Sequence, residues 1–228
     1  KSQRLYHRGV NIAVGDRKLI AACTDDKRFA IQSVDMPKNS ATMPAVCIPI
    51  DAARLMLETA VGRDGDLELS VSANLIEMRL PGVRLASALV DCKLPEYRHL
   101  LPKNPPLVTL RPYALAEAVE RASVVFLGEV DSNKRIPFVE VGIAQAGIEL
   151  RAGIRGNEQA VEFVEVETAT GEITIRFNAQ YLRETLAAWP EDVAIGISQD
   201  APGKPILFSS AARPDSLHLL APTVKDNS

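Results

Sequence analysis

The sequence predicts an α+β protein made of two similar halves, each with antiparallel sheets backing short helices. Much of the 228-residue chain alternates apolar and polar residues with a period of two, most clearly at residues 67–71, 139–143 and 173–177. Such alternation places one face of a strand on a core and the other in water. Pairs such as Gly15-Asp16 and Pro81-Gly82 separate the runs. They provide the backbone angles that tight hairpins require.

Three segments break the alternation and predict short helices over residues 50–61, 111–126 and 178–188. Each begins with a residue suited to a helix N-terminus, in order Asp51, Pro112 and Asn178. An Asx side chain caps free amides there, and proline fits the first turn. In the second segment one helical face carries Leu115, Val119, Ala122 and Phe126. In the third, Phe177 before the cap is placed to pack on Leu182 after it.

The order of these elements repeats along the chain. Strands, one helix and three further strands occur first over residues 5–90 and again over residues 137–220. A recurring order predicts two like-built domains, which we expect at residues 1–91 and 107–228. Only the second copy has a helix before its first strand. We therefore expect the first domain to lack its opening helix, as in a chain truncated at its N-terminus, which here begins with Lys1 rather than Met.

Residues 92–106 predict an extended linker between the two domains. The segment from residue 91 to residue 106 contains four prolines, Pro95, Pro102, Pro105 and Pro106. Proline has no backbone N–H to donate, so such a segment continues neither a sheet nor a helix.

The bulk composition limits the classes of protein that fit. The net charge is −3, whereas a domain that holds DNA by neutralising phosphates is usually basic. The cysteines are Cys23, Cys47 and Cys92, without a CxxC spacing, which favours reduced thiols in a cytoplasmic protein. We find no apolar run of membrane-spanning length and no signal peptide in the sequence.

Residues 92–102, Cys-Lys-Leu-Pro-Glu-Tyr-Arg-His-Leu-Leu-Pro, resemble the Gly-x-Phe-Pro-Asp-Tyr-x-x-x-Leu-Pro signature of the bacterial beta sliding clamps, the beta subunits of DNA polymerase III. Residues 4–10 and 22–30 resemble that family's Arg-Tyr-Tyr-Leu-Asn-Gly strand and its Ala-Thr-Asp-Gly-His-Arg-Leu-Ala segment. Residues 177–182 are similar to its Phe-Asn-x-x-Tyr, and residues 218–222 to its closing Val-Val-Met-Pro. These anchors occur in family order, so the chain is identified as resembling the second and third domains of the clamp.

The resemblance implies a non-enzymatic processivity factor without cofactor or metal. Family members form a homodimeric ring that encircles duplex DNA without sequence preference, with helices lining the hole. They bind DNA polymerase III, the clamp loader and repair polymerases through short hydrophobic peptides. The ring contact joins the first domain of one chain to the third domain of the other. We therefore expect this chain alone to be monomeric or weakly associating, and unable to close the ring.

The family's peptide groove lies between its second and third domains. Carried over by position, the groove residues are His7, Thr24, Asp26, Lys27, Arg28, Phe29, Pro95, His99, Leu100, Asn178, Tyr181, Leu219, Leu220, Ala221, Pro222 and Thr223. Several depart from the family: Asp26 replaces glycine, His99 replaces arginine, and Ala221 and Thr223 replace methionines. Methionine adapts to varied ligands, so this groove is expected to be stiffer and more selective. The alternative interpretation makes the large apolar members ordinary core residues of strands.

The resemblance also suggests which residues face DNA. These are Lys1, Tyr6, Arg54, Arg63, Arg111, Arg121 and Arg183. A ring retains DNA by topology, so an acidic chain is compatible with this function. The alternative for each arginine is an ordinary solvated position on a helix that also carries acidic residues.

Two other classes of protein remain open from the residues themselves. One is a β-rich enzyme with scattered acids such as Asp25, Glu96 and Glu140; the other is a peptide-binding adaptor without a role on DNA. The histidines His7, His99 and His218 lack metal-ligand spacing, and the sequence contains no phosphate-binding, nucleophile-elbow or zinc-protease motif. For the adjacent pair Asp25-Asp26, a turn is the favoured interpretation.

Overall fold

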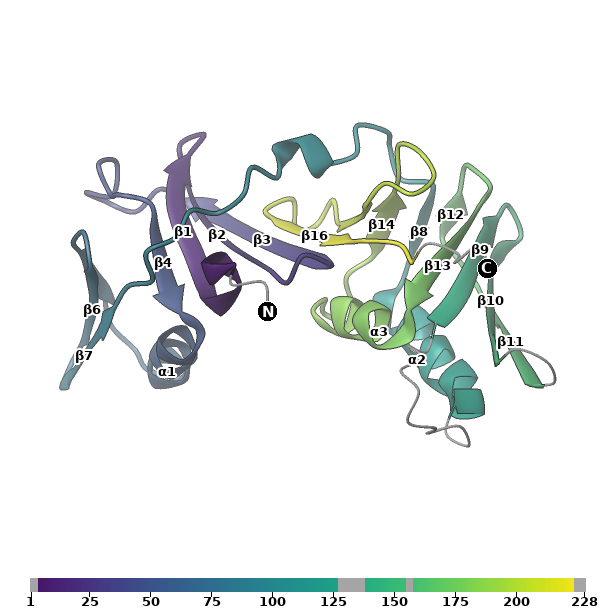
Figure 1. Ribbon diagram of the computed structural model, residues 1–228, viewed down its shortest axis with the longest axis horizontal. Coiled ribbons are helices and arrows are strands. Elements are labelled where there is room, and N and C mark those ends of the chain that lie inside the picture. Colours follow the sequence, from purple (N-terminus) through teal and green to yellow (C-terminus); the bar gives the residue numbers. More distant parts are fainter. Residues whose placement is uncertain (1–3, 127–137, 155–157, 224–228) are drawn as a thin grey trace. The chain divides into compact units, whose positions relative to one another are not determined.

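The computed structural model describes residues 4–126, 138–154 and 158–223 of the chain. It divides into two compact units, Lys1–Glu96 and Tyr97–Ser228, called here the N-terminal and C-terminal units. Both combine antiparallel sheets with short helices (Figure 1). The expectation of an α+β fold is therefore confirmed.

The N-terminal unit contains one α-helix, two sheets and a short 3-10 turn in its described part. Its elements are η1 (Leu5–Arg8), β1 (Gly9–Gly15), β2 (Lys18–Thr24), β3 (Arg28–Asp35), β4 (Val46–Pro49), α1 (Ile50–Ala60), β5 (Glu68–Val71), β6 (Leu75–Leu80) and β7 (Val83–Ala88).

The C-terminal unit contains two α-helices and two sheets in its described part. Its elements are η2 (Arg98–Leu100), β8 (Val108–Leu110), α2 (Pro112–Ala122), η3 (Ser123–Phe126), β9 (Phe138–Ala144), β10 (Gly147–Ile154), β11 (Glu158–Val164), β12 (Thr168–Ala169), β13 (Ile173–Asn178), α3 (Ala179–Ala187), β14 (Ile195–Ser198), β15 (Ile206–Ser209) and β16 (Ser216–Leu220).

The strand orders of the two units repeat each other. Within the N-terminal unit one sheet has the order β3-β2-β1-β4, and the C-terminal unit has the matching order β11-β10-β9-β13. In each unit a helix follows the last of these strands, and three strands then form a meander, β5-β6-β7 or β14-β15-β16. The C-terminal unit adds β8, which pairs with β14. The repeat expected from the order of elements is therefore present in the strand pairing itself.

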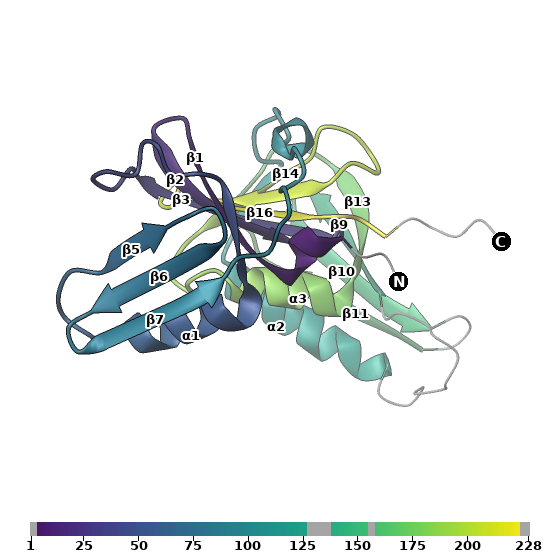
Figure 2. The same cartoon turned by 60° about the vertical axis from the view of Figure 1, so that its left-hand side comes forward.

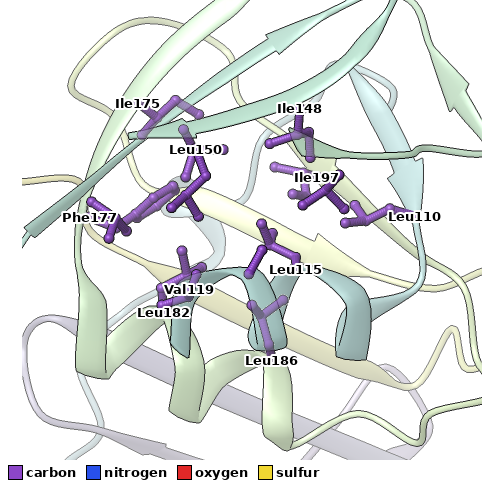
Figure 3. Close-up of a cluster of buried hydrophobic side chains, with 14 of the residues drawn as sticks. Leu110, Leu115, Val119, Ile148, Leu150, Ile175, Phe177, Leu182, Leu186 and Ile197 are labelled. Carbon is purple, nitrogen blue, oxygen red and sulfur yellow. The ribbon is translucent and has the colours of Figure 1, made fainter. Parts of the chain in front are cut away.

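The core of the C-terminal unit lies between its two helices and its sheets. Leu115 and Val119 from α2 and Leu182 and Leu186 from α3 are at most 1% exposed. Figure 3 shows these side chains pointing toward strand residues that include Ile148, Leu150, Ile175, Phe177 and Ile197. Burial of this many large apolar side chains is the main term that stabilises the unit.

The core of the N-terminal unit is smaller. Met56 of α1 packs against the sheet residues Ile76, Met78 and Leu80, with Ile48 from β4 completing the cluster. Figure 2 shows α1 lying along the β5-β6-β7 sheet. The helix also leaves Leu57 65% exposed, so only one of its faces is committed to this core.

The helix starts agree with the sequence at two of three positions. Asn178 caps α3 by accepting a hydrogen bond from the backbone N–H of Tyr181 at 2.9 Å, and Pro112 is the first residue of α2. Asp51 does not cap α1, whose N-cap residue is Pro49. The helix starts one residue before Asp51, which puts that side chain inside the first turn.

The first segment of the chain also differs from the expectation. Residues 5–8 form the 3-10 turn η1 rather than a strand, and β1 begins at Gly9. The His7 N–H donates to the Arg4 carbonyl at 3.1 Å. This i to i−3 bond is the pattern of a 3-10 turn and excludes strand pairing at that residue.

Cys47 is expected to resist alkylation in the folded protein. It is fully buried, and burial together with a hydrogen bond to the Cys92 thiol raises the pKa of Cys47 to about 12. At pH 8 almost no thiolate is present, and only the thiolate reacts. We expect iodoacetamide to modify Cys47 at least about a hundredfold more slowly in the native chain than in urea. Peptide mapping by mass spectrometry measures both rates, and equal rates would contradict the buried placement.

Candidate functional site

A hydrogen-bonded turn joins β2 to β3 and carries several of the residues expected at the peptide groove. The Asp25 carboxylate accepts hydrogen bonds from the backbone N–H groups of Lys27 at 3.0 Å and Arg28 at 2.7 Å. The Thr24 hydroxyl donates to the Arg28 carbonyl at 2.7 Å. Asp26 adopts the left-handed conformation with φ of 70°. The expectation that Asp25-Asp26 forms a turn is confirmed.

Asp26 is the centre of a cluster of side chains from η1 and from Arg4, the residue before it. Arg4 Nη1 lies 2.5 Å from Asp26 Oδ2, and His7 Nε2 lies 3.0 Å from Oδ1. The Tyr6 hydroxyl donates to the same Oδ1 at 3.2 Å. Although burial opposes ionisation, the hydrogen bonds from Arg4 and His7 outweigh it and lower the pKa of Asp26. The cluster ties η1 to the turn.

Removing Arg4 is expected to raise the pKa of Asp26 toward its ordinary value. A depressed folded-state pKa means that the ionised carboxylate contributes stability above its unfolded pKa, and that this contribution is lost as the pH falls through the folded pKa. In Arg4→Ala the loss should therefore occur at higher pH. Carbon-13 NMR of the carboxyl groups measures the shift. Asp25 is the internal control, because the pKa of Asp25 is lowered, against the effect of burial, by its hydrogen bonds with Arg28 and Lys27. An unchanged Asp26 titration would argue against the ion pair.

Phe29, the second residue of β3, lies on the face of its sheet that points away from the core of the N-terminal unit. Thr24 and Phe29 are paired across β2 and β3, as are Ala22 and Ile31. Side chains alternate along a strand, and the residues of this sheet that reach the core, Ile12 and Ile48, lie on the other face. Phe29 is 7% exposed and is not part of that core cluster.

Two adjacent leucines of β16 lie on opposite faces of its sheet, one facing the core and one facing away from it. Leu220 pairs with Ile206, and both belong to the core of the C-terminal unit. Leu219 pairs with Leu207 on the opposite face, and neither is part of that core. The interpretation of these residues as ordinary core therefore holds for Leu220, whereas Leu219 lies on the face that is not committed to the helices.

Polar side chains of the expected groove set lie at the end of β13 and at the start of α3. The Asn178 side chain is held by the α3 cap, and Tyr181 follows it on the helix, partly buried. Beyond β16, Ala221 and Pro222 are partly buried and Thr223 is exposed. The Thr223 N–H donates to the Arg176 carbonyl at 2.7 Å, which fixes the end of the described chain along β13.

The segment expected to be an extended linker contains a turn. Arg98–Leu100 form η2, closed by the Leu100 N–H donating to the Tyr97 carbonyl at 2.8 Å. Pro95 and His99 are exposed and Leu100 is partly buried. Further along, the Asp200 carboxylate accepts from the backbone N–H groups of residues 103 and 104. The second half of this segment is thus attached to the C-terminal unit.

The candidate DNA-facing arginines fall into two groups. Arg111 lies 3.0 Å from Glu167, and Arg121 lies 2.8 Å from Glu162, so their charges are already paired. Arg54 on α1, Arg63 after it and Arg183 on α3 are exposed, and they have no ion pair with the part of the chain that the structure describes. Tyr6 belongs to the Asp26 cluster, and Lys1 lies outside the described residues.

Sequence reasoning missed two residues of this region. Arg4 was outside the groove set although it contacts Asp26, and Arg176 was outside it although it precedes Asn178 on the same strand face. The alternation around β13, with Ile175 and Phe177 in the core, indicates that Arg176 points outward, but the sequence does not show what it contacts.

The described residues contain no cluster of three or more side chains that could hold a metal ion. His218 packs against Trp189 with ring centroids 5.1 Å apart, and burial lowers the pKa of His218. None of the described helices has the length and apolar character to cross a membrane.

A duplicated unit of paired antiparallel sheets and helices, with apolar side chains facing away from its own core, defines a clamp-type fold. The family model for the central domain of the DNA polymerase III beta subunit matches residues 1–96, and the model for its C-terminal domain matches residues 98–224. The chain belongs to the DNA polymerase III beta subunit family.

Individual relatives agree with this assignment. The beta sliding clamp of Caulobacter vibrioides is 31% identical over 182 residues, which are 78% of this chain and 46% of that protein. The beta sliding clamp of Pseudomonas aeruginosa is 26% identical over 96% of this chain and 58% of that protein. The crystal structure of the Bacillus subtilis DNA polymerase sliding clamp has a TM-score of 0.87 at 19% identity, over 99% of this chain and 58% of that chain. The chain thus spans about half the length of these relatives.

Proposed function

We propose that this chain supplies two of the domains of a processivity clamp for bacterial DNA replication. The full protein would encircle duplex DNA and hold DNA polymerase III, the clamp loader and repair polymerases on it through their peptides, without catalysing a reaction. The observation that carries the proposal is the match of residues 1–96 and 98–224 to consecutive domains of one family. The duplicated strand order in the two units supports it.

Peptide binding is supported by apolar side chains that each unit leaves outside its own core. The N-terminal unit contributes Phe29 beside the 24–28 turn. The C-terminal unit contributes Leu219 on β16, and β16 contacts α3, the helix that Asn178 caps and that carries Tyr181. Hydrophobic anchors with a few polar neighbours are what a short apolar peptide needs from its receptor. We propose that these residues, with the remainder of the expected groove set except the core residue Leu220, bind the partner peptide.

Peptide binding is tested directly by titration. A fluorescein-labelled clamp-binding peptide from a replicative polymerase is titrated with the chain and followed by fluorescence anisotropy. We expect saturation with a Kd of about micromolar order, which corresponds to roughly 8 kcal/mol, and no saturation with a scrambled peptide. Equal binding of both peptides would remove the support for a sequence-selective site.

Encirclement of DNA explains how an acidic chain can act on a polyanion. The net charge is −3, and a topological link needs only loose contact with phosphates. Arg54, Arg63 and Arg183 are the proposed contacts, since they are exposed and have no ion pair with the described residues. Retention on DNA should then depend more on whether the DNA is a closed circle than on the salt concentration.

Assembly of the full protein needs a surface between chains, and β11 is a candidate. It is the last strand in the order β11-β10-β9-β13. Its side chains Val161 and Phe163 are 57% and 58% exposed. An open strand edge with exposed apolar side chains favours pairing with another chain. We propose that the homodimer uses this edge.

A peptide-binding adaptor without a role on DNA is the second candidate. The pairing of Arg111 and Arg121 with glutamates favours it, because it removes two of the positive charges available to phosphates. The full-length protein, loaded by its clamp loader on nicked circular DNA, separates the two functions. A clamp stays bound at high salt and is released when the circle is cut, whereas an adaptor shows no dependence on DNA topology.

A further inference from the structure

Arg176 occupies an outward position on β13, next to the residues proposed to bind the peptide. Its Cα partner on β9 is Glu140, and that of Asn178 is Phe138. Because side chains alternate along a strand, these four residues share the sheet face opposite Ile175 and Phe177, which lie in the core.

The Arg176 guanidinium is stacked on an aromatic ring, but its hydrogen-bond donors are only partly satisfied. Its central carbon lies 4.1 Å from the centroid of the Phe138 ring, a stacking that restricts the plane of the head group. Its only ion pair among the described residues is a long one, 3.4 Å from Nη2 to Glu140 Oε2. Nε is buried and has no hydrogen-bond partner among those residues. A buried donor without an acceptor is unfavourable, so an incoming acceptor is favoured.

The backbone of Arg176 is joined to the proposed peptide-binding residues. Its carbonyl accepts from the Thr223 N–H at 2.7 Å, and Thr223 continues the chain that includes Leu219. The Asn178 side chain oxygen is already used in the α3 cap. Arg176 therefore lies beside Thr223, three residues after the end of β16, and about a fifth of its side chain (21%) is exposed.

We propose that Arg176 binds a carboxylate of the partner peptide and so selects peptides with an acidic group beside the hydrophobic anchors. This inference rests on the proposed function. A guanidinium offers parallel N–H donors that match both oxygens of a carboxylate. The stacking on Phe138 orients the guanidinium before the peptide arrives. Glu140 accepts from the same guanidinium, so the peptide carboxylate has to compete with it, and this competition lowers the affinity for the peptide.

The test uses two matched nonapeptides with a Leu-Ala-Leu-Phe core. One has aspartates flanking the core and the other has asparagines, and each is made with a free and an amidated C-terminus. In Arg176→Ala we expect the aspartate peptide to lose about tenfold in affinity and the asparagine peptide less than about twofold. Arg176→Lys should recover only part of the loss, because lysine lacks the planar fork. Glu140→Gln should increase the affinity for the aspartate peptide.

The controls separate the possible results. Arg213→Ala removes an exposed arginine elsewhere in the C-terminal unit and should not discriminate between the peptides. Dependence on the free C-terminus alone would assign the terminal carboxylate as the ligand, and dependence on aspartate would assign a side chain. Equal loss for both peptides, or no loss for either, would overturn the role of Arg176. Failure of wild-type protein to bind any of the peptides, or the polymerase peptide described above, would instead count against the proposed function.

Discussion

Replacing Leu219 with aspartate is expected to abolish binding of the polymerase peptide, with a loss of at least about a hundredfold in affinity. Leu219 is 3% exposed but lies outside the core cluster of its unit, on the face opposite Leu220. A carboxylate at this position would have to be desolvated against the apolar side chain of the peptide, with no partner to compensate it. Fluorescence anisotropy with the labelled peptide measures the loss.

The neighbouring leucine provides the matched control. Leu220 is fully buried within the core, so Leu220→Asp should unfold the C-terminal unit rather than only remove binding. The emission of Trp189, the single tryptophan of the chain and a member of the same core, reports that unfolding. Leu219 is itself 3% exposed, so the emission and the urea midpoint of Leu219→Asp are measured before its loss of binding is interpreted. A folded Leu219→Asp protein that binds the peptide as tightly as wild type would refute the assignment of this face to the peptide.

Replacing Leu182 with alanine is expected to destabilise the C-terminal unit by about 3 kcal/mol. Leu182 is fully buried on α3 between α2 and the sheets, beside Phe177 and Leu186. Truncation removes apolar contacts from a closely packed region and leaves a cavity that the surrounding helices and sheets fill only partly. Urea unfolding followed by Trp189 emission measures the change in the free energy of unfolding of this unit.

Arg183→Ala is the control for this substitution. Arg183 is the next residue on the same helix and is exposed, so its replacement should change the free energy of unfolding by less than about 0.5 kcal/mol. If the two variants unfolded at the same urea concentration, the packing of α3 against the core would have to be reconsidered.

Much of the fold was predictable because its signals are local. Asn178 caps a helix through an amide three residues away, and the strands of each meander alternate within a few residues. Such patterns depend on nearest neighbours in the chain, so a single sequence is enough to interpret them. The prediction that Asp51 caps α1 was wrong by a small shift, because the helix begins at Ile50, one residue before the expected cap.

The contacts of the candidate site could not be predicted in the same way. Arg4 contacts Asp26 across 22 residues of sequence, and Arg176 on β13 stacks on Phe138 of the neighbouring strand β9. The face of each leucine in β16 was also undetermined, because the adjacent pair Leu219-Leu220 interrupts the alternation. Only the register of β15 and β16, which pairs Leu219 with Leu207 and Leu220 with Ile206, assigns each side chain to a face.

The left-handed backbone of Asp26 has a consequence for tolerance to substitution. With φ of 70°, the position is one that glycine occupies without steric cost, and glycine is the residue of the resembling family segment. Aspartate gives up that freedom but gains its contacts with Arg4, Tyr6 and His7. Asp26→Gly should therefore relieve the backbone strain but lose the aspartate contacts, and so leave the melting temperature nearly unchanged. Alanine, which has neither advantage, should lower it.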